Sequence, residues 1–301
     1  MRTKITVITY TIHELSDYIN WLYFFHAWNF QPRFASIADI HGCDACRAAW
    51  LANFPTADIS KAAEAMQLHK EAMRMLNTME QTCTVKAVFR LMDANADGDD
   101  LLLEGKRFPL LRQQTHVHAT DPYLCLSDFV RPLSQGIPDT VGAFATTTED
   151  ILEKQFEHDP YKHLLAQTLN ERLAEAAANK LHETIRKEIW GYAKDEHLTR
   201  QQLLNEEYQG IRPAVGYPSL PDLSVNFLLD ELIDMKSIGI RLTENGMMQP
   251  HASVCGLMLA HPQARYFAVG KIDEHQLADY AARRGKDVSY IRNYLTTNLQ
   301  Y

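Results

Sequence analysis

A long amphipathic pattern between residues 160 and 192 sets the first limit on the fold. Apolar side chains recur there every four residues, at Leu165, Leu169, Leu173, Ala177, Leu181 and Ile185. Because an α-helix has 3.6 residues per turn, this stripe drifts slowly around one long helix and forms its buried face. A second helix is predicted over 58–81, after Pro55 and with Asp58 as its candidate cap. Thr11 and Glu14 form a capping-box pattern before a third helix, on which one face carries Ile12, Leu15, Ile19 and Leu22.

Strand patterns occupy other parts of the chain. From 85 to 92, apolar residues at every second position, beginning with Val85 and Ala87, indicate a β-strand. Two apolar runs, 252–260 and 265–272, are separated by HPQA and predict a hairpin, and two short helices follow at 274–284 and 287–297. Since helices and strands come in blocks rather than in strict alternation, the pattern favours the α+β class with a mostly antiparallel sheet.

Composition excludes several kinds of protein. The chain has 301 residues and is 46% hydrophobic, which allows a large core. Its net charge of -8 argues against a nucleic-acid partner held through phosphates. No apolar run approaches the ~18 residues of a membrane span, and no signal-peptide pattern opens the chain. Five cysteines in a chain of this length do not make a disulfide scaffold. We therefore expect a soluble, cytoplasmic protein with no membrane partner.

The segment DANADGDDLLLE, residues 93–104, matches the calcium-loop pattern, with Asp93, Asn95, Asp97 and Glu104 as ligands. Such a loop needs a helix on each side. Here a strand pattern enters the segment, while Gly105 and Pro109 disfavour a helix after it. We interpret residues 96–99 as a hairpin turn and the calcium match as coincidence.

Two further clusters resemble metal sites. His41, Cys43 and Cys46 look like half a zinc or redox site, but no second CxxC motif follows, and the run after Cys46 looks helical. We prefer two small apolar side chains at a helix start. His116 and His118 could share one face of a strand, although no third ligand is near in sequence, so surface histidines are the preferred interpretation. We predict no metal site and no catalytic residue.

The stretch GIRPAVGYPSLPD, residues 210–222, contains three prolines and two glycines. It can be neither a helix nor a central strand, so it predicts an irregular, stiff loop. Such a loop could hold Arg212 and Tyr217 in fixed positions. Arginine offers a planar fork for a carboxylate, and tyrosine offers a ring face to a base or a cation. A site for a nucleotide bearing an amino acid fits this pattern, and a purely structural turn is the alternative. No glycine-rich phosphate loop, nucleophile elbow or HExxH motif occurs.

Several separated blocks of this sequence resemble the activation domain of cobalamin-dependent methionine synthase. They are DYINWLYFF (17–25), YLCLSDFV (123–130), VGAFATT (141–147), RLAEAAANKLHETIRKEIWGYA (172–193), YQGIRPAVGYPSLPD (208–222) and LTENGMMQPHASVCGLMLAHPQARYFAVG (242–270). The closing TNLQY resembles the end of the family as well. The resemblance covers essentially the whole chain.

The resemblance implies one α+β domain over residues 1–301, with a twisted, mostly antiparallel sheet flanked by helices. It implies that this domain binds S-adenosylmethionine and supplies its methyl group for the reductive methylation of cob(II)alamin, which reactivates the synthase in methionine biosynthesis. The partners would be a cobalamin-binding domain or subunit and a flavodoxin-like electron donor. The chain would be part of a methyltransferase and inactive alone. A capping module for a corrinoid protein that does not use S-adenosylmethionine is the alternative.

The same resemblance implies a set of binding residues. Arg212 matches the arginine that holds the ligand carboxylate, and Gly216 and Tyr217 follow it in the loop. Tyr266 and Phe267 match aromatic positions of the site, and Glu175 and Glu206 match acidic positions near the cationic end of the ligand.

One position departs from the family pattern. Asn20 stands where the family has an aspartate that is expected to bind the ligand ammonium. Asparagine keeps an acceptor but loses the charge, which weakens the hydrogen bond. Asp17, three residues earlier on the expected helix, could compensate in part.

Overall fold

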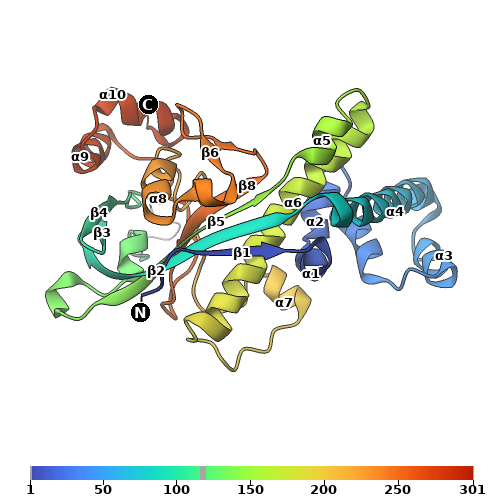
Figure 1. Ribbon diagram of the computed structural model, residues 1–301, viewed down its shortest axis with the longest axis horizontal. Coiled ribbons are helices and arrows are strands. Elements are labelled where there is room, and N and C mark those ends of the chain that lie inside the picture. The colour runs from blue at the N-terminus through green and yellow to red at the C-terminus, as the bar shows by residue number, and fades with distance from the viewer. Residues whose placement is uncertain (1, 116–119, 301) are drawn as a thin grey trace.

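The protein is described by a computed structural model over residues 2–115 and 120–300, so the predicted pair His116 and His118 lies outside the described residues. Its centre is a six-stranded antiparallel sheet (Figure 1). The strands run in the order β4-β3-β2-β5-β8, and β1 pairs with the first part of β2. Their bounds are β1 (Thr6–Tyr10), β2 (Val85–Asp97), β3 (Asp100–Leu103), β4 (Lys106–Pro109), β5 (Asp139–Thr148) and β8 (Ser253–Met258). The predicted α+β class and antiparallel sheet are confirmed.

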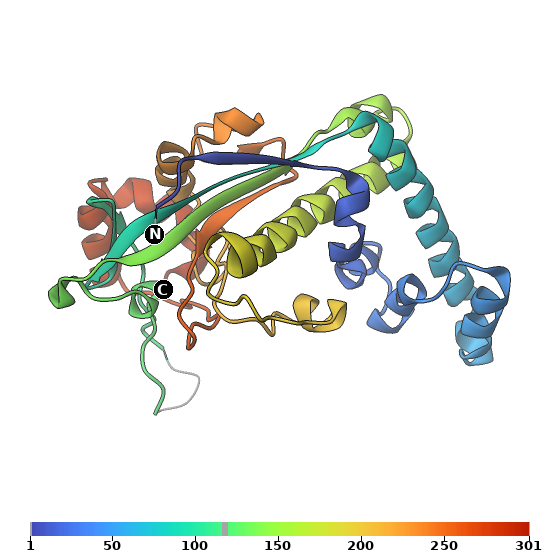
Figure 2. The ribbon, with the colours of Figure 1, turned by 60° about the horizontal axis from the view of Figure 1, so that its bottom comes forward.

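Helices pack against both faces of the sheet. Side chains alternate along β2, so Phe89 and Leu91 belong to the core under α6, whereas Val88 and Met92 belong to the core under α8. Figure 2 shows α6 lying across one face, with α4 and α3 projecting beyond its end. The helices are α1 (Ile12–Leu15), α2 (Trp21–Ala27), α3 (Asp44–Ala52), α4 (Ile59–Thr82), α5 (Ile151–Gln155), α6 (Pro160–Thr184), α7 (Arg200–Leu204), α8 (Val225–Ile233), α9 (Glu274–Arg284) and α10 (Val288–Tyr294).

The long predicted helix is confirmed as α6. Asp159 caps it by accepting a hydrogen bond from Lys162 N, and every member of the predicted apolar stripe is buried. The helix continues as one π-helical segment, Ile185–Ile189. The helix predicted over 58–81 is confirmed as α4, although the Asp58 side chain makes no capping bond and pairs with Arg33 at 2.9 Å instead.

The predicted helix after Thr11 is interrupted. The capping box of Thr11 and Glu14 is present, but α1 gives way to a short 3-10 turn, Ser16–Tyr18, and an extended residue, Ile19. The Asn20 side chain then caps a separate helix, α2. The prediction of one continuous face was therefore wrong: Leu22 is exposed, and Asp17 does not share a helical face with Asn20.

The hairpin predicted over 252–272 was also wrong. The first run forms β8, but residues 265–272 form no strand beside it. They use their backbone groups elsewhere, because Val269 N donates to Pro218 O at 2.9 Å and Ile272 N donates to Asn298 O at 2.7 Å. The two short helices that follow are confirmed as α9 and α10.

The hairpin predicted near residue 98 is confirmed. Strands β2 and β3 pair in the register Asp97 with Asp100, and the two residues between them, of which Gly98 has a φ of 61°, form the turn. The calcium-loop pattern is not flanked by helices: Asp93, Asn95 and Asp97 lie on β2, and Glu104 lies in the turn after β3. Glu104, its last ligand, accepts a hydrogen bond from Arg90 at 2.6 Å.

A separate two-stranded sheet consists of β6 (Arg241–Leu242) and β7 (Met248–Gln249). In the part of the chain that the structure describes, no helix is both long and apolar enough to span a membrane.

Candidate functional site

A groove of about 920 Å³ lies between α2, α6, the segment after α7 and the loop 210–222. The residues that line it include seven of the eight predicted binding residues: Asn20, Glu175, Glu206, Arg212, Tyr217, Tyr266 and Phe267. Gly216, the eighth, is not among the lining residues but precedes Tyr217 in the loop, where it has a φ of 86°. Residues that are far apart in sequence therefore meet at one site.

The loop 210–222 is held along the free edge of β8. Ile211 and Leu259 exchange two backbone hydrogen bonds of 2.9 Å, and Leu257 N donates to Pro213 O at 3.0 Å. A side chain on Gly256 would place its Cβ 2.1 Å from Pro213 O, so only glycine allows this approach. The predicted stiff loop is thus anchored by backbone pairing, which positions Arg212 at the groove.

Arg212 is buried and forms the centre of the site. Its Nη2 donates to Asn179 Oδ1 at 2.6 Å, and its Nη1 lies 3.8 Å from Glu175 Oε2. Its Nε is buried and has no acceptor among the described residues. The pKa of the guanidinium is raised, since burial is outweighed by the nearby Tyr208, Tyr266 and acidic groups. A fixed, charged donor whose buried Nε–H is unused remains for an anionic ligand.

Glu175 links α6 to the loop. It accepts a hydrogen bond from the Tyr217 hydroxyl at 2.9 Å. The negative charge of Glu175 raises the pKa of Tyr217 to about 12, so the tyrosine keeps its proton and donates. Tyr217 itself is 54% exposed, which leaves a ring face open at the mouth of the groove.

Glu206 supplies a second carboxylate. It lies just after α7 with a φ of 60°, and its side chain has no hydrogen-bond or ion-pair partner among residues 2–115 and 120–300. Glu206 is exposed, but desolvation by the neighbouring groove wall raises the pKa of this carboxyl, Arg212 lowers it and Glu175 raises it further. An unpaired acid beside the groove is available to a cationic group.

Asn20 lines the groove but also starts α2. Its Oδ1 accepts hydrogen bonds from Leu22 N at 3.1 Å and from Tyr23 N at 3.4 Å. The acceptor that the sequence assigned to a ligand ammonium is therefore engaged in capping the helix.

Tyr266 and Phe267 are brought to the groove by the segment that was expected to be a strand. The Tyr266 hydroxyl accepts a hydrogen bond from Arg212 N at 2.9 Å, and Phe267 O accepts one from Ser219 Oγ at 2.6 Å. The two aromatic residues thus support the loop as well as lining the site.

Several lining residues were absent from the predicted set, and three of them carry polar or aromatic side chains next to the predicted ones: Tyr23, Arg172 and Asn179. Arg172 and Asn179 share the α6 face of Glu175, at three and four residues from it, so helical spacing could have found them. Tyr23 is 58% exposed, and the Arg172 guanidinium lies 5.9 Å from its ring centre. The sequence pattern does not mark Tyr23 as a groove residue, because its direction depends on the break in the chain before α2.

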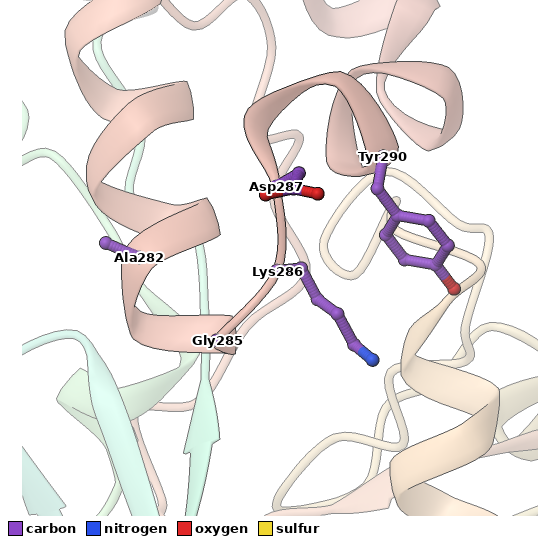
Figure 3. Close-up of a pocket in the computed structure, with 5 residues that line it drawn as sticks. All are labelled: Ala282, Gly285, Lys286, Asp287 and Tyr290. Carbon is purple, nitrogen blue, oxygen red and sulfur yellow. The ribbon is translucent and has the colours of Figure 1, made fainter.

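A second hollow, of about 390 Å³, lies between α9 and α10 (Figure 3). It is lined by Ala282, Gly285, Lys286, Asp287 and Tyr290, and none of the predicted binding residues is in its lining. It lacks the convergent buried charges of the groove.

The predicted helix start at the CxxC motif is confirmed, because Cys43 caps α3. A hydrogen bond with His41 lowers the pKa of the Cys43 thiol to about 6, and the Cys46 amide contributes in the same direction. This cluster lies outside the groove lining.

Comparisons with known proteins identify the family. The model of the vitamin B12 dependent methionine synthase activation domain matches residues 11–285. Among solved structures, the MetH reactivation domain bound to AdoHcy has a TM-score of 0.88 and 35% sequence identity, over 100% of this chain and 91% of that one. The chain therefore belongs to the family of vitamin B12 dependent methionine synthase activation domains.

Proposed function

We propose that this chain binds S-adenosylmethionine in the groove and supplies its methyl group for the reductive methylation of cob(II)alamin, reactivating cobalamin-dependent methionine synthase. The family membership supports this reading. AdoHcy, which the similar MetH reactivation domain holds, is S-adenosylmethionine without the transferable methyl group. When bound, S-adenosylmethionine contributes an electrophilic methyl on a sulfonium.

The observation that carries the proposal is the buried Arg212. Its Nε has no acceptor among the described residues, and an unsatisfied buried donor is costly. A ligand carboxylate would accept from this N–H and add a charge-assisted bond. Asn179 holds the guanidinium in place by accepting a hydrogen bond from its Nη2, so little side-chain entropy is lost on binding. The groove volume of about 920 Å³ also suits a nucleoside with an amino-acid tail.

The rest of the groove suits the cationic groups of the same ligand. Glu206 offers an unpaired carboxylate, and Glu175 also lines the groove, beside Tyr217. The open faces of Tyr217 and Tyr266 can pack on an adenine ring or meet a sulfonium. In this proposal Asn20, Gly216 and Phe267 complete the site.

We place the partner surface at the mouth of the groove. Tyr23, Tyr217 and Tyr266 are 58%, 54% and 39% exposed there, and exposed aromatic groups are typical of recognition surfaces. A cobalamin-binding domain or subunit would dock on this rim, with a flavodoxin-like protein as the electron donor. Residues 1–301 would act as one activation domain in the cytoplasm, inactive alone and without a membrane or nucleic-acid partner.

Substitution of Arg212 tests the proposal. Arg212→Ala removes the fork, and we expect S-adenosylmethionine affinity to fall by ~1.5–3 kcal/mol, about tenfold to 150-fold. Arg212→Lys keeps the charge but loses the fork and should also bind more weakly. Binding is measured by titration calorimetry on the whole chain.

Two controls separate a lost contact from lost folding. Methylthioadenosine lacks the carboxylate, so its affinity should be unchanged in both Arg212 variants if the groove is intact. Arg241→Ala, at an exposed arginine of β6 outside the groove lining, should bind S-adenosylmethionine as the unmodified chain does. Equal losses for S-adenosylmethionine and methylthioadenosine would contradict the assigned role of Arg212. No binding by the unmodified chain would favour the capping module that does not use S-adenosylmethionine.

A further inference from the structure

Three side chains able to bind a metal converge at the start of α3, outside the groove. One nitrogen of His41 and the sulfur atoms of Cys43 and Cys46 all lie within 4.8 Å of one another. Around a tetrahedral zinc ion with bonds of 2.0–2.3 Å, neighbouring ligand atoms are roughly 3.3–3.8 Å apart. Small side-chain rotations would therefore bring these atoms to the spacing that zinc requires.

The backbone prepares the two cysteines for this role. Cys43 is extended, with φ -79° and ψ 158°, and caps the nine-residue helix α3. Its sulfur accepts a hydrogen bond from Cys46 N at 3.3 Å, so Cys46 stands in the first helical turn beside it. The CxxC spacing and the helix start thus place both sulfur atoms on one side of the segment, without a change of fold.

Exposure distinguishes these two cysteines from the others in the chain. Cys43 and Cys46 are half-buried, whereas Cys83, Cys125 and Cys255 are buried. His41 is exposed. An ion could reach all three ligand atoms from solvent, and the open side would leave room for a fourth ligand. Sulfur and imidazole ligands favour zinc over magnesium or calcium, which prefer oxygen.

We propose that His41, Cys43 and Cys46 bind one zinc ion, with water or an external ligand in the fourth position, and that the ion ties the turn before α3 to its first helical turn. The sequence argued against zinc because no second CxxC motif follows to complete a closed site of four protein ligands. The observed geometry instead suits a site with three protein ligands and one open position. This site is independent of S-adenosylmethionine binding.

Metal titration of the reduced, metal-stripped chain tests the proposal. Zinc is titrated in competition with a chromophoric chelator, and cobalt is used in parallel because thiolate ligation produces strong near-ultraviolet absorption. We expect one ion per chain, a cobalt–thiolate absorption band, and a higher melting temperature with zinc than with chelator. Cys43→Ser or Cys46→Ser should reduce the band to about half and weaken zinc binding by more than about tenfold, the double change should abolish the band, and His41→Gln should weaken binding as well.

Asp44→Asn is the matched control. Asp44 stands between the two cysteines, and its side chain is fully exposed beside Arg47, so its loss removes a charge but no proposed ligand. This variant should retain the stoichiometry and the cobalt band. The melting temperature in chelator shows whether each variant folds. Zinc binding that survives the double change Cys43→Ser and Cys46→Ser, or the absence of stoichiometric binding by the folded chain, would overturn the proposal.

Discussion

Replacing Asn20 with aspartate should tighten S-adenosylmethionine binding. In the structure Asn20 Oδ1 caps α2 by accepting from Leu22 N and Tyr23 N. Aspartate is an equally good cap, and its charge is favoured at a helix N-terminus, so α2 should keep its place. The second carboxylate oxygen would take the position of the amide nitrogen. It would add an acceptor and a negative charge at the wall of the groove, where the ligand ammonium is expected.

The size of the effect follows from the half-buried position of Asn20. At ~4 Å, a pair of unit charges interacts by about 1 kcal/mol in water and about 4 kcal/mol near a protein surface. Desolvation and ordering cancel much of this, and exposed pairs usually contribute ~0.2–1 kcal/mol. We expect a net gain of about 0.5–2 kcal/mol, or roughly twofold to thirtyfold in affinity.

Calorimetric titration of Asn20→Asp at low and high salt provides the assay. The gain should shrink as salt rises, because screening weakens partly exposed charge pairs. It should vanish with methylthioadenosine, which has no ammonium group. Unchanged S-adenosylmethionine affinity, with the melting temperature also unchanged, would refute the placement of the ammonium beside Asn20. Glu206 would then be the better candidate for its partner.

Three other substitutions probe the surroundings of the site. The pKa of Glu206 is raised, and its carboxylate is charged only above that pKa. Affinity for a cationic ligand should therefore be highest above the pKa of Glu206 and fall as the pH drops through it. Glu206→Gln should make the affinity less dependent on pH in titrations at several pH values. Arg284→Met leaves Asp222, which is 1% exposed, without its ion-pair partner at 2.7 Å, and urea unfolding should show a loss of ~3–5 kcal/mol. A loss below ~1 kcal/mol, as for an exposed pair, would contradict this. Gly256→Ala should push away Pro213 and so weaken S-adenosylmethionine binding, and an unchanged affinity would show that the loop tolerates the shift.

Local signals predicted much of the fold. The helix over 274–284 was correct at both ends because Asp273 caps it and Gly285 ends it in the left-handed region. The turn at Gly98 follows from the need for a positive φ between two paired strands. Both features depend on residues close in sequence, and no distant contact overrides them.

Distant contacts decided the features that were predicted wrongly. Residues 265–272 have a strand-like composition, but the backbone of Val269 bonds to the proline-rich loop instead of to β8. The break before α2 depends on the Asn20 cap, which competes with continuation of the first helix. The groove residues were found through family motifs, whereas the unused N–H of Arg212 and the engaged oxygen of Asn20 could be seen only in the structure.

Calorimetric titration of the unmodified chain with S-adenosylmethionine tests the central claim most directly. The account predicts saturable binding to one site per chain, together with a rise in melting temperature in the presence of the ligand. Absence of both heat and thermal stabilisation at millimolar S-adenosylmethionine would contradict it.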